Sequence, residues 1–396
     1  MISDGKDNGA VRTAGNTKYL RAMNSVAIRN IIASDGPLSR KQLAARTGLT
    51  AAAVTGITAM LIRRGVLIEA GLSAPAGGRP AILLNIAPKV ATVLAASIQK
   101  GSINSALFDI HGNILSRRFS TFGASSPEDA VDTVSRQAGQ MLQESGMEPA
   151  DLAVASFATA GLVNPYTGVV KRSTNLGWRD EPIAEKLKAA LKVPVLVENN
   201  SNAAALAEMA EGAGRGSKNL VYLSVSAGIG AGIILDGRIY SGSHGYAGEV
   251  GHTPAVPSGG ALCSCGRRGC LEAEYSAGAI SAKLAVDDLE GLMDGPLSGE
   301  PDVLRVMGEA SEAIGRTVAV LMSLYDPEVV VIGGEIASVG GTFLDDVTRS
   351  AKSHCLGELA DRLDIRGSGL LKDTPMVGAR LIALGRLLNM QEWKKD

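Results

Sequence analysis

Two neighbouring segments, GYAGEVGH at residues 245–252 and CSCGRRGCLE at residues 263–272, decide how the middle of this chain folds. Together they hold a histidine and three of the chain's four cysteines. Imidazole and thiolate are the ligands that structural zinc prefers, and four of them close a tetrahedral site. The spacing predicts one structural Zn²⁺ per chain; the alternative is three free thiols in a glycine-rich loop. The predicted ligands are His252, Cys263, Cys265 and Cys270.

Composition limits the class of protein. A length of 396 residues suggests two or three domains, and 45% hydrophobic content is enough for a sizeable core. No apolar run approaches the ~18 residues that a membrane span needs. The polar start of the chain has no apolar signal segment. Clustered thiols without a secretory signal suit a reducing compartment, so we expect a cytoplasmic protein with no membrane partner.

Charge is divided unevenly along the chain. Residues 1–85 contain 11 basic and 4 acidic side chains, whereas the remainder contains 28 basic and 36 acidic ones. A basic head on an acidic body indicates that only the head meets a polyanion such as DNA.

The basic head carries the signals of a helix-turn-helix. Residues 1–16 are polar and glycine-rich, which predicts a disordered N-terminus. A helical pattern follows and is broken at 35–37, after which Ser39 is placed to cap a short helix. Gly48 fits a tight turn, and Thr50 caps the next helix.

A wing completes the predicted DNA-binding domain at residues 17–86. Short apolar runs at 66–71 and 81–86 flank a glycine-rich tip, which indicates two strands. Small side chains at the start of the recognition helix can approach base edges, and an arginine at the wing tip can enter a narrow minor groove. A helical protein-interaction module is the alternative. The expected DNA contacts are Ser39, Thr50, Ala51, Ala52, Thr55, Gly56 and Arg79.

The acidic body alternates buried strands and helices in two α/β halves. We expect a small lobe at 87–198 and a large lobe with the zinc-bearing loop at 199–396, with the last helix returning to the small lobe.

The segments around the predicted zinc ligands resemble the signature of the ROK family, which contains bacterial sugar kinases and sugar-responsive transcriptional repressors. The resemblance covers about residues 19–390. It implies an α/β fold in which a winged helix-turn-helix precedes a two-lobed, actin-like ATPase or sugar-kinase domain of ribonuclease H-like type. By resemblance, the sugar contacts are Gly161, Asn175, Asn199, Asn200, Glu249, His252 and Glu272.

Three phosphate-related sites depart from the pattern of the family's kinases. Ser97 replaces an Asp that organises magnesium, and Gln99-Lys100-Gly101 replaces a Gly-Gly-Thr turn. Asn200 replaces the general base, and a carboxamide cannot take a proton; losing a base costs ~10²–10⁴ in rate. Ala227 replaces a usual Thr in a second glycine loop. These departures predict a protein that is not an enzyme and has no catalytic residue.

We therefore expect a cytoplasmic, sugar-responsive DNA-binding regulator that represses genes of carbohydrate uptake or catabolism. Its expected partners are operator DNA, a sugar or sugar phosphate, and a second copy of the chain, with a tetramer also open. One alternative is an ATP-dependent hexose kinase that also binds DNA. Another is a repressor controlled by a protein partner.

Overall fold

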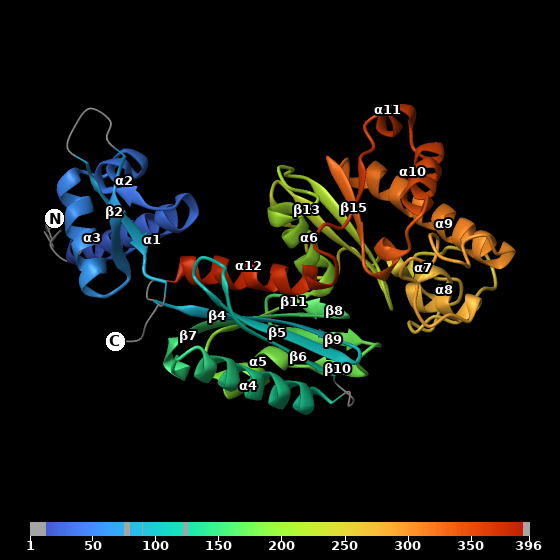
Figure 1. Ribbon diagram of the computed structural model, residues 1–396, viewed down its shortest axis with the longest axis horizontal. Helices are drawn as coiled ribbons and strands as arrows, with labels where there is room; N and C mark the ends of the chain where they lie inside the picture. Colours follow the sequence, from blue (N-terminus) through green and yellow to red (C-terminus); the bar gives the residue numbers. More distant parts are fainter. Residues whose placement is uncertain (1–12, 75–79, 89, 122–125, 391–396) are drawn as a thin grey trace, which may run out of the picture.

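The computed structural model describes residues 13–74, 80–88, 90–121 and 126–390. Figure 1 shows three parts in a curved row: a head, a small lobe and a large lobe.

The head is a winged helix-turn-helix. The Ser39 side chain accepts from the backbone of Gln42 while the Gln42 side chain accepts from the backbone of Ser39, so a capping box starts α2. Thr50 caps α3 in turn. The strands form one sheet in the order β1-β3-β2. The elements are α1 (Thr13–Asp35), β1 (Leu38–Ser39), α2 (Arg40–Thr47), α3 (Ala51–Arg63), β2 (Leu67–Leu72) and β3 (Ile82–Ile86).

One prediction for the head differs from the structure, and two others concern residues that the structure does not describe. Helix α1 begins at Thr13, before the expected boundary at residue 17, and residues 1–12 of the predicted disordered segment lie outside the described residues. Arg79, the predicted wing-tip contact with DNA, also lies outside the described residues.

Within the described part of the chain, no single helix is long and apolar enough to cross a membrane. Helices α2 and α3 pass that test only as a pair, and the pair is bent by 118°.

The small lobe is a five-stranded sheet in the order β11-β7-β4-β5-β6. Helix α4 packs on β5 and β6, and a second, three-stranded sheet in the order β10-β9-β8 adjoins the end of the lobe. The elements are β4 (Thr92–Gln99), β5 (Ser102–Asp109), β6 (Ile114–Thr121), α4 (Pro127–Glu144), β7 (Leu152–Thr159), β8 (Leu162–Asn164), β9 (Val169–Ser173), β10 (Trp178–Glu181), α5 (Ile183–Leu191) and β11 (Val195–Asn199).

The large lobe is a second five-stranded sheet, in the order β14-β13-β12-β15-β16. Helix α6 packs on β12 and β13, and the long helix α9 packs with α10 over the lobe's main hydrophobic core. The elements are α6 (Asn200–Glu211), β12 (Leu220–Val225), β13 (Ile229–Leu235), β14 (Arg238–Ile239), α7 (Leu271–Tyr275), α8 (Ala277–Leu284), α9 (Pro301–Tyr325), β15 (Val329–Gly333), α10 (Phe343–His354), α11 (Gly357–Ala360) and β16 (Ile365–Gly367).

Helix α12 (Thr374–Asn389) contacts both lobes. It packs on β4 and β7 of the small lobe and on α6 of the large lobe. Gly378 allows the approach to α6, because a Cβ at this position would lie 1.9 Å from the carbonyl oxygen of Ala203. Figure 1 shows α12 running from the large lobe across the small lobe toward the head.

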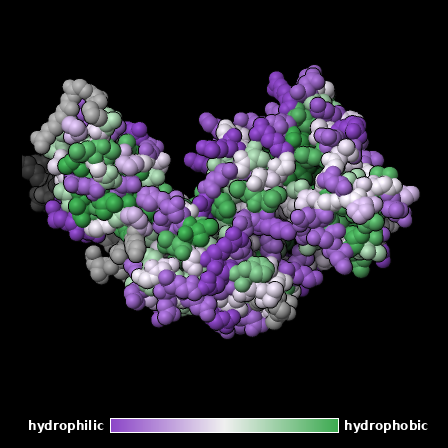
Figure 2. All heavy atoms as spheres, in the orientation of Figure 1, coloured by the Kyte–Doolittle hydropathy of each residue, from purple (hydrophilic) through white to green (hydrophobic). Residues whose placement is uncertain are grey.

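The C-terminal end of α12 is hydrogen-bonded to helix α1 of the head. Nη2 of Arg29, a buried residue of α1, donates to the carbonyl oxygen of Met390 (2.6 Å). The amide nitrogen of Asn30, in the orientation that satisfies its neighbours, donates to the carbonyl of Leu388 (2.9 Å). Apolar residues of the head, α12 and the small-lobe sheet form one continuous core. In Figure 2 hydrophobic residues gather on the head and along the floor of the hollow above α12.

Candidate functional site

The histidine and the three cysteines singled out in the sequence converge in space. The ligand atoms of His252, Cys263, Cys265 and Cys270 all lie within 4.8 Å of one another. Sγ of Cys263 is 3.5 Å from Nδ1 of His252, and Sγ of Cys265 is 3.6 Å from Sγ of Cys270. Ligands of tetrahedral zinc at bond lengths of about 2.3 Å lie about 3.8 Å apart. The donor set and its spacing therefore fit Zn²⁺.

The backbone before His252 lies directly against strand β13. The amide of Ala231 donates to the carbonyl of Gly248 (2.7 Å), and a Cβ at Gly248 would lie 1.9 Å from the carbonyl oxygen of Ala231. Only glycine permits this approach. A short 3₁₀ turn, Val250–His252, then presents the His252 ring to the cysteines.

Two glutamates lie beside this cluster of His252 and the three cysteines. Oε2 of Glu272 accepts from the backbone amide of Ile229 (3.1 Å), and Oε1 accepts from the hydroxyl of Ser264 (3.3 Å). Burial, and secondarily the negative charge of Glu272, raises the pKa of Glu249 to about 7. A methyl group at Gly228 would lie 2.8 Å from Oε2 of Glu272 and 3.5 Å from Nδ2 of Asn175, so both side chains face this glycine.

The asparagines lie at the start of α6. The Asn199 side chain caps the helix by accepting from the amide of Ser201 (2.7 Å), and its Nδ2 donates to the carbonyl of Gly161 (2.8 Å). Oδ1 also accepts from the amide of Asn202 (3.4 Å), so Asn199 retains one N–H donor for a ligand. The buried Oδ1 of Asn200 has no hydrogen-bond partner among the described residues. Water or a ligand hydroxyl would satisfy such an acceptor.

Ser97 and Asn200, two of the positions that depart from the kinase pattern, lie at the same edge of the small-lobe sheet. Ile98 and Asn199 both pair with Thr159, so β4 and β11 end on either side of β7. The three strands are parallel, and ligands bind at the carboxyl ends of such strands. The Ser97 hydroxyl is buried and accepts from Nε2 of Gln99 (3.2 Å). It therefore offers this edge no carboxylate.

The recognition helix exposes the side chains expected to face DNA. Thr50, Ala51, Ala52, Thr55 and Gly56 are all exposed along the start of α3.

Ser39 requires a correction. It is 6% exposed and its hydroxyl belongs to the capping box of α2, so it is a helix cap and does not present itself to DNA.

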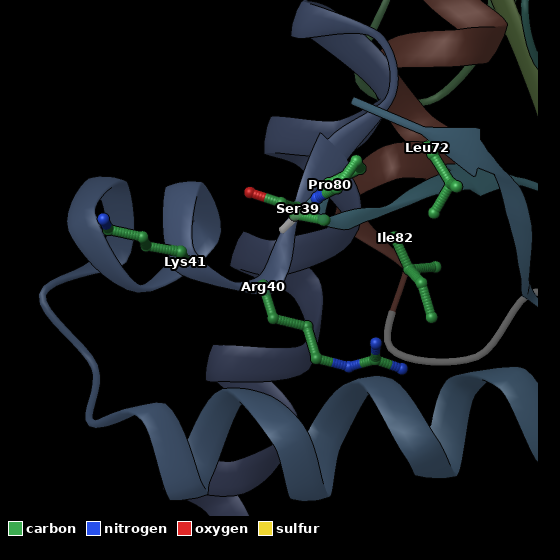
Figure 3. A pocket seen from close by; sticks show the side chains of 7 residues that line it. Ser39, Arg40, Lys41, Leu72, Pro80 and Ile82 are labelled. Atoms are coloured by element: carbon green, nitrogen blue, oxygen red, sulfur yellow. The ribbon is translucent and has the colours of Figure 1, made fainter. Parts of the chain in front are cut away.

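A pocket in the head lies between the start of α2 and the wing (Figure 3). Leu72 and Ile82 give it an apolar wall, and Nε of Arg40 donates to the Thr58 hydroxyl (3.2 Å). Lys41 points away into solvent. The pocket lacks the carboxylates and amides that recognise sugar hydroxyls, so the converging polar groups of the body form the better ligand site. Its lining residues are Ser39, Arg40, Lys41, Leu72, Pro80, Ala81 and Ile82.

The family model described as ROK family matches residues 96–386, well over half of the chain. The chain belongs to the ROK family. The fold class and the family expected from the sequence are both confirmed.

The relatives of this ROK protein fall into two groups. A glucokinase from Halalkalibacterium halodurans is 33% identical over 261 residues, covering 61% of this chain and 78% of the relative. A xylose repressor from Bacillus subtilis is 25% identical over 379 residues, covering 94% of this chain and 97% of the repressor. A solved ROK family transcriptional regulator, homologous to the Escherichia coli MLC protein, superimposes with a TM-score of 0.77 at 26% identity, covering 94% and 99% of the two chains. The regulator architecture is thus confirmed over almost the whole length.

One residue of the site escaped the sequence reasoning. Nη2 of Arg172, in β9, donates to the carbonyl of Ser264 in the metal-binding loop (2.6 Å). The sequence around Arg172 does not indicate this contact, because the hydrogen-bond partner lies 92 residues away along the chain.

Proposed function

We propose that this ROK protein is a sugar-responsive repressor that binds operator DNA and binds a sugar or sugar phosphate without phosphorylating it. The observation that carries the proposal is the likeness to a repressor over 94% of this chain, whereas the likeness to a glucokinase covers 61% of it. The genes that it represses would serve carbohydrate uptake or catabolism.

The metal would act as a scaffold. Four protein ligands leave no open coordination position, so Zn²⁺ at His252 and the three cysteines would supply structure only. With Nδ1 of His252 turned to the cluster, Nε2 stays available to donate to a sugar hydroxyl. Glu272 lies in the first turn of α7, two residues after Cys270, so bound metal would hold two sugar contacts together.

The sugar would lie between the acidic pair and the asparagines. Glu249 and Glu272 accept from hydroxyl groups, while Asn175 and Asn200 can donate or accept. The unpartnered Oδ1 of Asn200 supports this assignment, since a sugar hydroxyl would supply the missing donor. Asn199 and Gly161 would frame the site from the small lobe.

The second candidate is a hexose kinase that also binds DNA, which the likeness to a glucokinase favours. Against it stand the carboxamide of Asn200 in place of a general base and the buried hydroxyl of Ser97 in place of a carboxylate.

Helix α12 provides a route from sugar to DNA. It packs on α6, whose first turn carries Asn200, and its C-terminal end is hydrogen-bonded to α1 of the head. A lobe movement that shifts α6 would therefore shift the head. In a two-fold dimer, which we also propose, this would change the separation of the two recognition helices. The protein would act in the cytoplasm, where operator DNA lies.

The test is to titrate D-glucose, D-xylose, N-acetylglucosamine and their phosphates with and without operator DNA. Coupling between two sites is typically 1–3 kcal/mol and must be reciprocal. We expect one of these compounds to weaken operator binding, and operator to weaken its binding by the same factor. Glu249→Ala should bind the operator normally but no longer respond. A ligand that binds free and operator-bound protein equally would rule out the switch.

A further inference from the structure

We propose that Arg172 is a positioning residue that latches the metal-binding loop to the small lobe and thereby orients Glu272. The latch is independent of the ligand, whereas its effect on sugar binding rests on the proposed function.

The latch joins two separate parts of the body. Arg172 belongs to β9, the middle strand of the three-stranded sheet that adjoins the small lobe. Its acceptor, the carbonyl of Ser264, lies between Cys263 and Cys265 in the loop of the large lobe. The hydrogen bond has a charged donor and an N–O distance of 2.6 Å, which places it among the stronger kinds.

Ser264, whose carbonyl accepts from Arg172, also contacts Glu272 through its side chain. The Ser264 hydroxyl donates to Oε1 of Glu272 (3.3 Å), while the amide of Ile229 in β13 donates to Oε2 (3.1 Å). One oxygen is therefore held by a loop tied to the small lobe, and the other by a strand of the large lobe. The orientation of Glu272 consequently depends on how the two lobes sit against each other.

The backbone of Arg172 also lies close to the part of the site that carries Asn199. The carbonyl of Arg172 lies against Gly161, since a Cβ there would be 2.4 Å from it. The carbonyl of Gly161 in turn accepts from Asn199. A continuous set of contacts thus runs from Asn199 through Gly161 and Arg172 to Ser264 and Glu272.

The first experiment measures the latch without sugar, by amide hydrogen exchange on the full chain. Arg172→Ala should raise exchange in peptides covering 261–272 while the remainder of the large lobe keeps its rates. Arg179→Ala is the matched control, because Arg179 is exposed and pairs directly with Arg172 across β9 and β10. Unchanged exchange in Arg172→Ala, or an equal rise in Arg179→Ala, would overturn the latch.

The second experiment measures positioning, by calorimetry with the sugar or sugar phosphate that wild type binds from the panel above. We expect Arg172→Ala to weaken binding about fivefold, as for loss of one partly exposed charged hydrogen bond, with operator affinity in the absence of sugar unchanged. Arg172→Lys should recover part of the loss.

A double-mutant cycle separates positioning from general stability. If Arg172 acts through Ser264 on Glu272, the losses in Arg172→Ala and Ser264→Ala should not add in the double variant. Additive losses, or unchanged affinity in Arg172→Ala, would overturn the positioning role. A wild type that binds no compound of the panel would instead overturn the proposed function, and hydrogen exchange then decides the latch by itself.

Discussion

Single residues decide what the ligand site can do chemically. At the carboxyl edge of the small-lobe sheet, Asn200 offers a carboxamide and Ser97 a buried hydroxyl, and neither is a carboxylate. Beside the metal cluster, Glu249 and Glu272 retain the groups that bind hydroxyls. Two of the carboxylates expected to contact a sugar are therefore present, whereas two positions expected to serve phosphoryl transfer hold an amide and a hydroxyl.

The first prediction concerns Asn200. Wild type should show no hexose-dependent ATP turnover, and Asn200→Asp should not restore it, because Ser97 still leaves magnesium without its carboxylate. The measurement is coupled-enzyme detection of ADP over a hexose panel, with the Halalkalibacterium halodurans glucokinase as the positive control. Turnover by wild type well above background would return the kinase alternative to first place.

The second prediction concerns the metal ligands. Purified wild type should contain about one zinc per chain, and Cys263→Ala should lose it because three ligands bind structural zinc far more weakly than four. Elemental analysis by mass spectrometry measures this. Cys355→Ala is the control, since the half-buried Cys355 lies outside the cluster and should keep the metal. Zinc-free wild type, prepared without chelators, would contradict the assignment.

At the scale of elements, α12 differs from the other helices because it contacts the sheet of one lobe, a helix of the other and the head. The sequence analysis expected this last helix to return to the small lobe but did not predict its contacts with α6 and with the head. Its position follows from the close packing of Gly378 on α6 and from the hydrogen bonds that Arg29 and Asn30 make to its end.

The third prediction concerns this packing. Gly378→Ala should lower the free energy of unfolding by ~1–3 kcal/mol, because the new methyl group meets the backbone of Ala203. Gly385→Ala on the same helix has open space and should raise it by up to about 1 kcal/mol, through helix propensity alone. Chemical denaturation measures both.

The two variants should also differ in how strongly sugar changes their operator affinity. In Gly378→Ala, sugar should shift operator affinity less than in wild type, whereas Gly385→Ala should respond normally. A full response in a destabilised Gly378→Ala would mean that coupling does not pass through the contact of α6 with α12.

At the scale of the whole molecule, a basic head joins an acidic body, and this division makes DNA binding sensitive to salt. The fourth prediction is that operator affinity falls linearly on a log–log plot against salt. Lys41→Ala should weaken binding to all sequences alike and reduce the slope by about 1, because Lys41 is exposed on α2 and we expect its charge to neutralise one phosphate of bound DNA.

Lys188→Ala provides the comparison, since it removes an equal charge from an exposed position in α5 of the body. Fluorescence anisotropy at several salt concentrations should find its slope unchanged. Equal effects of the two substitutions would mean that the head is not the part that meets DNA.

The sequence by itself determined the features that depend on local spacing. The histidine and three cysteines of the cluster fall within 19 residues, and the caps Ser39 and Thr50 act on amides three positions away, so short-range geometry sufficed. The family signature and the missing carboxylates were likewise readable in single segments.

Only the tertiary structure decided the contacts between distant segments. Arg172 meets Ser264 across 92 residues, and Arg29 meets Met390 across 361. The burial of Ser39, which removed it from the expected DNA contacts, also depends on packing. These contacts form because burial of apolar side chains brings distant helices and strands together, and the side-chain pattern of one segment does not identify the partner that the folded chain supplies.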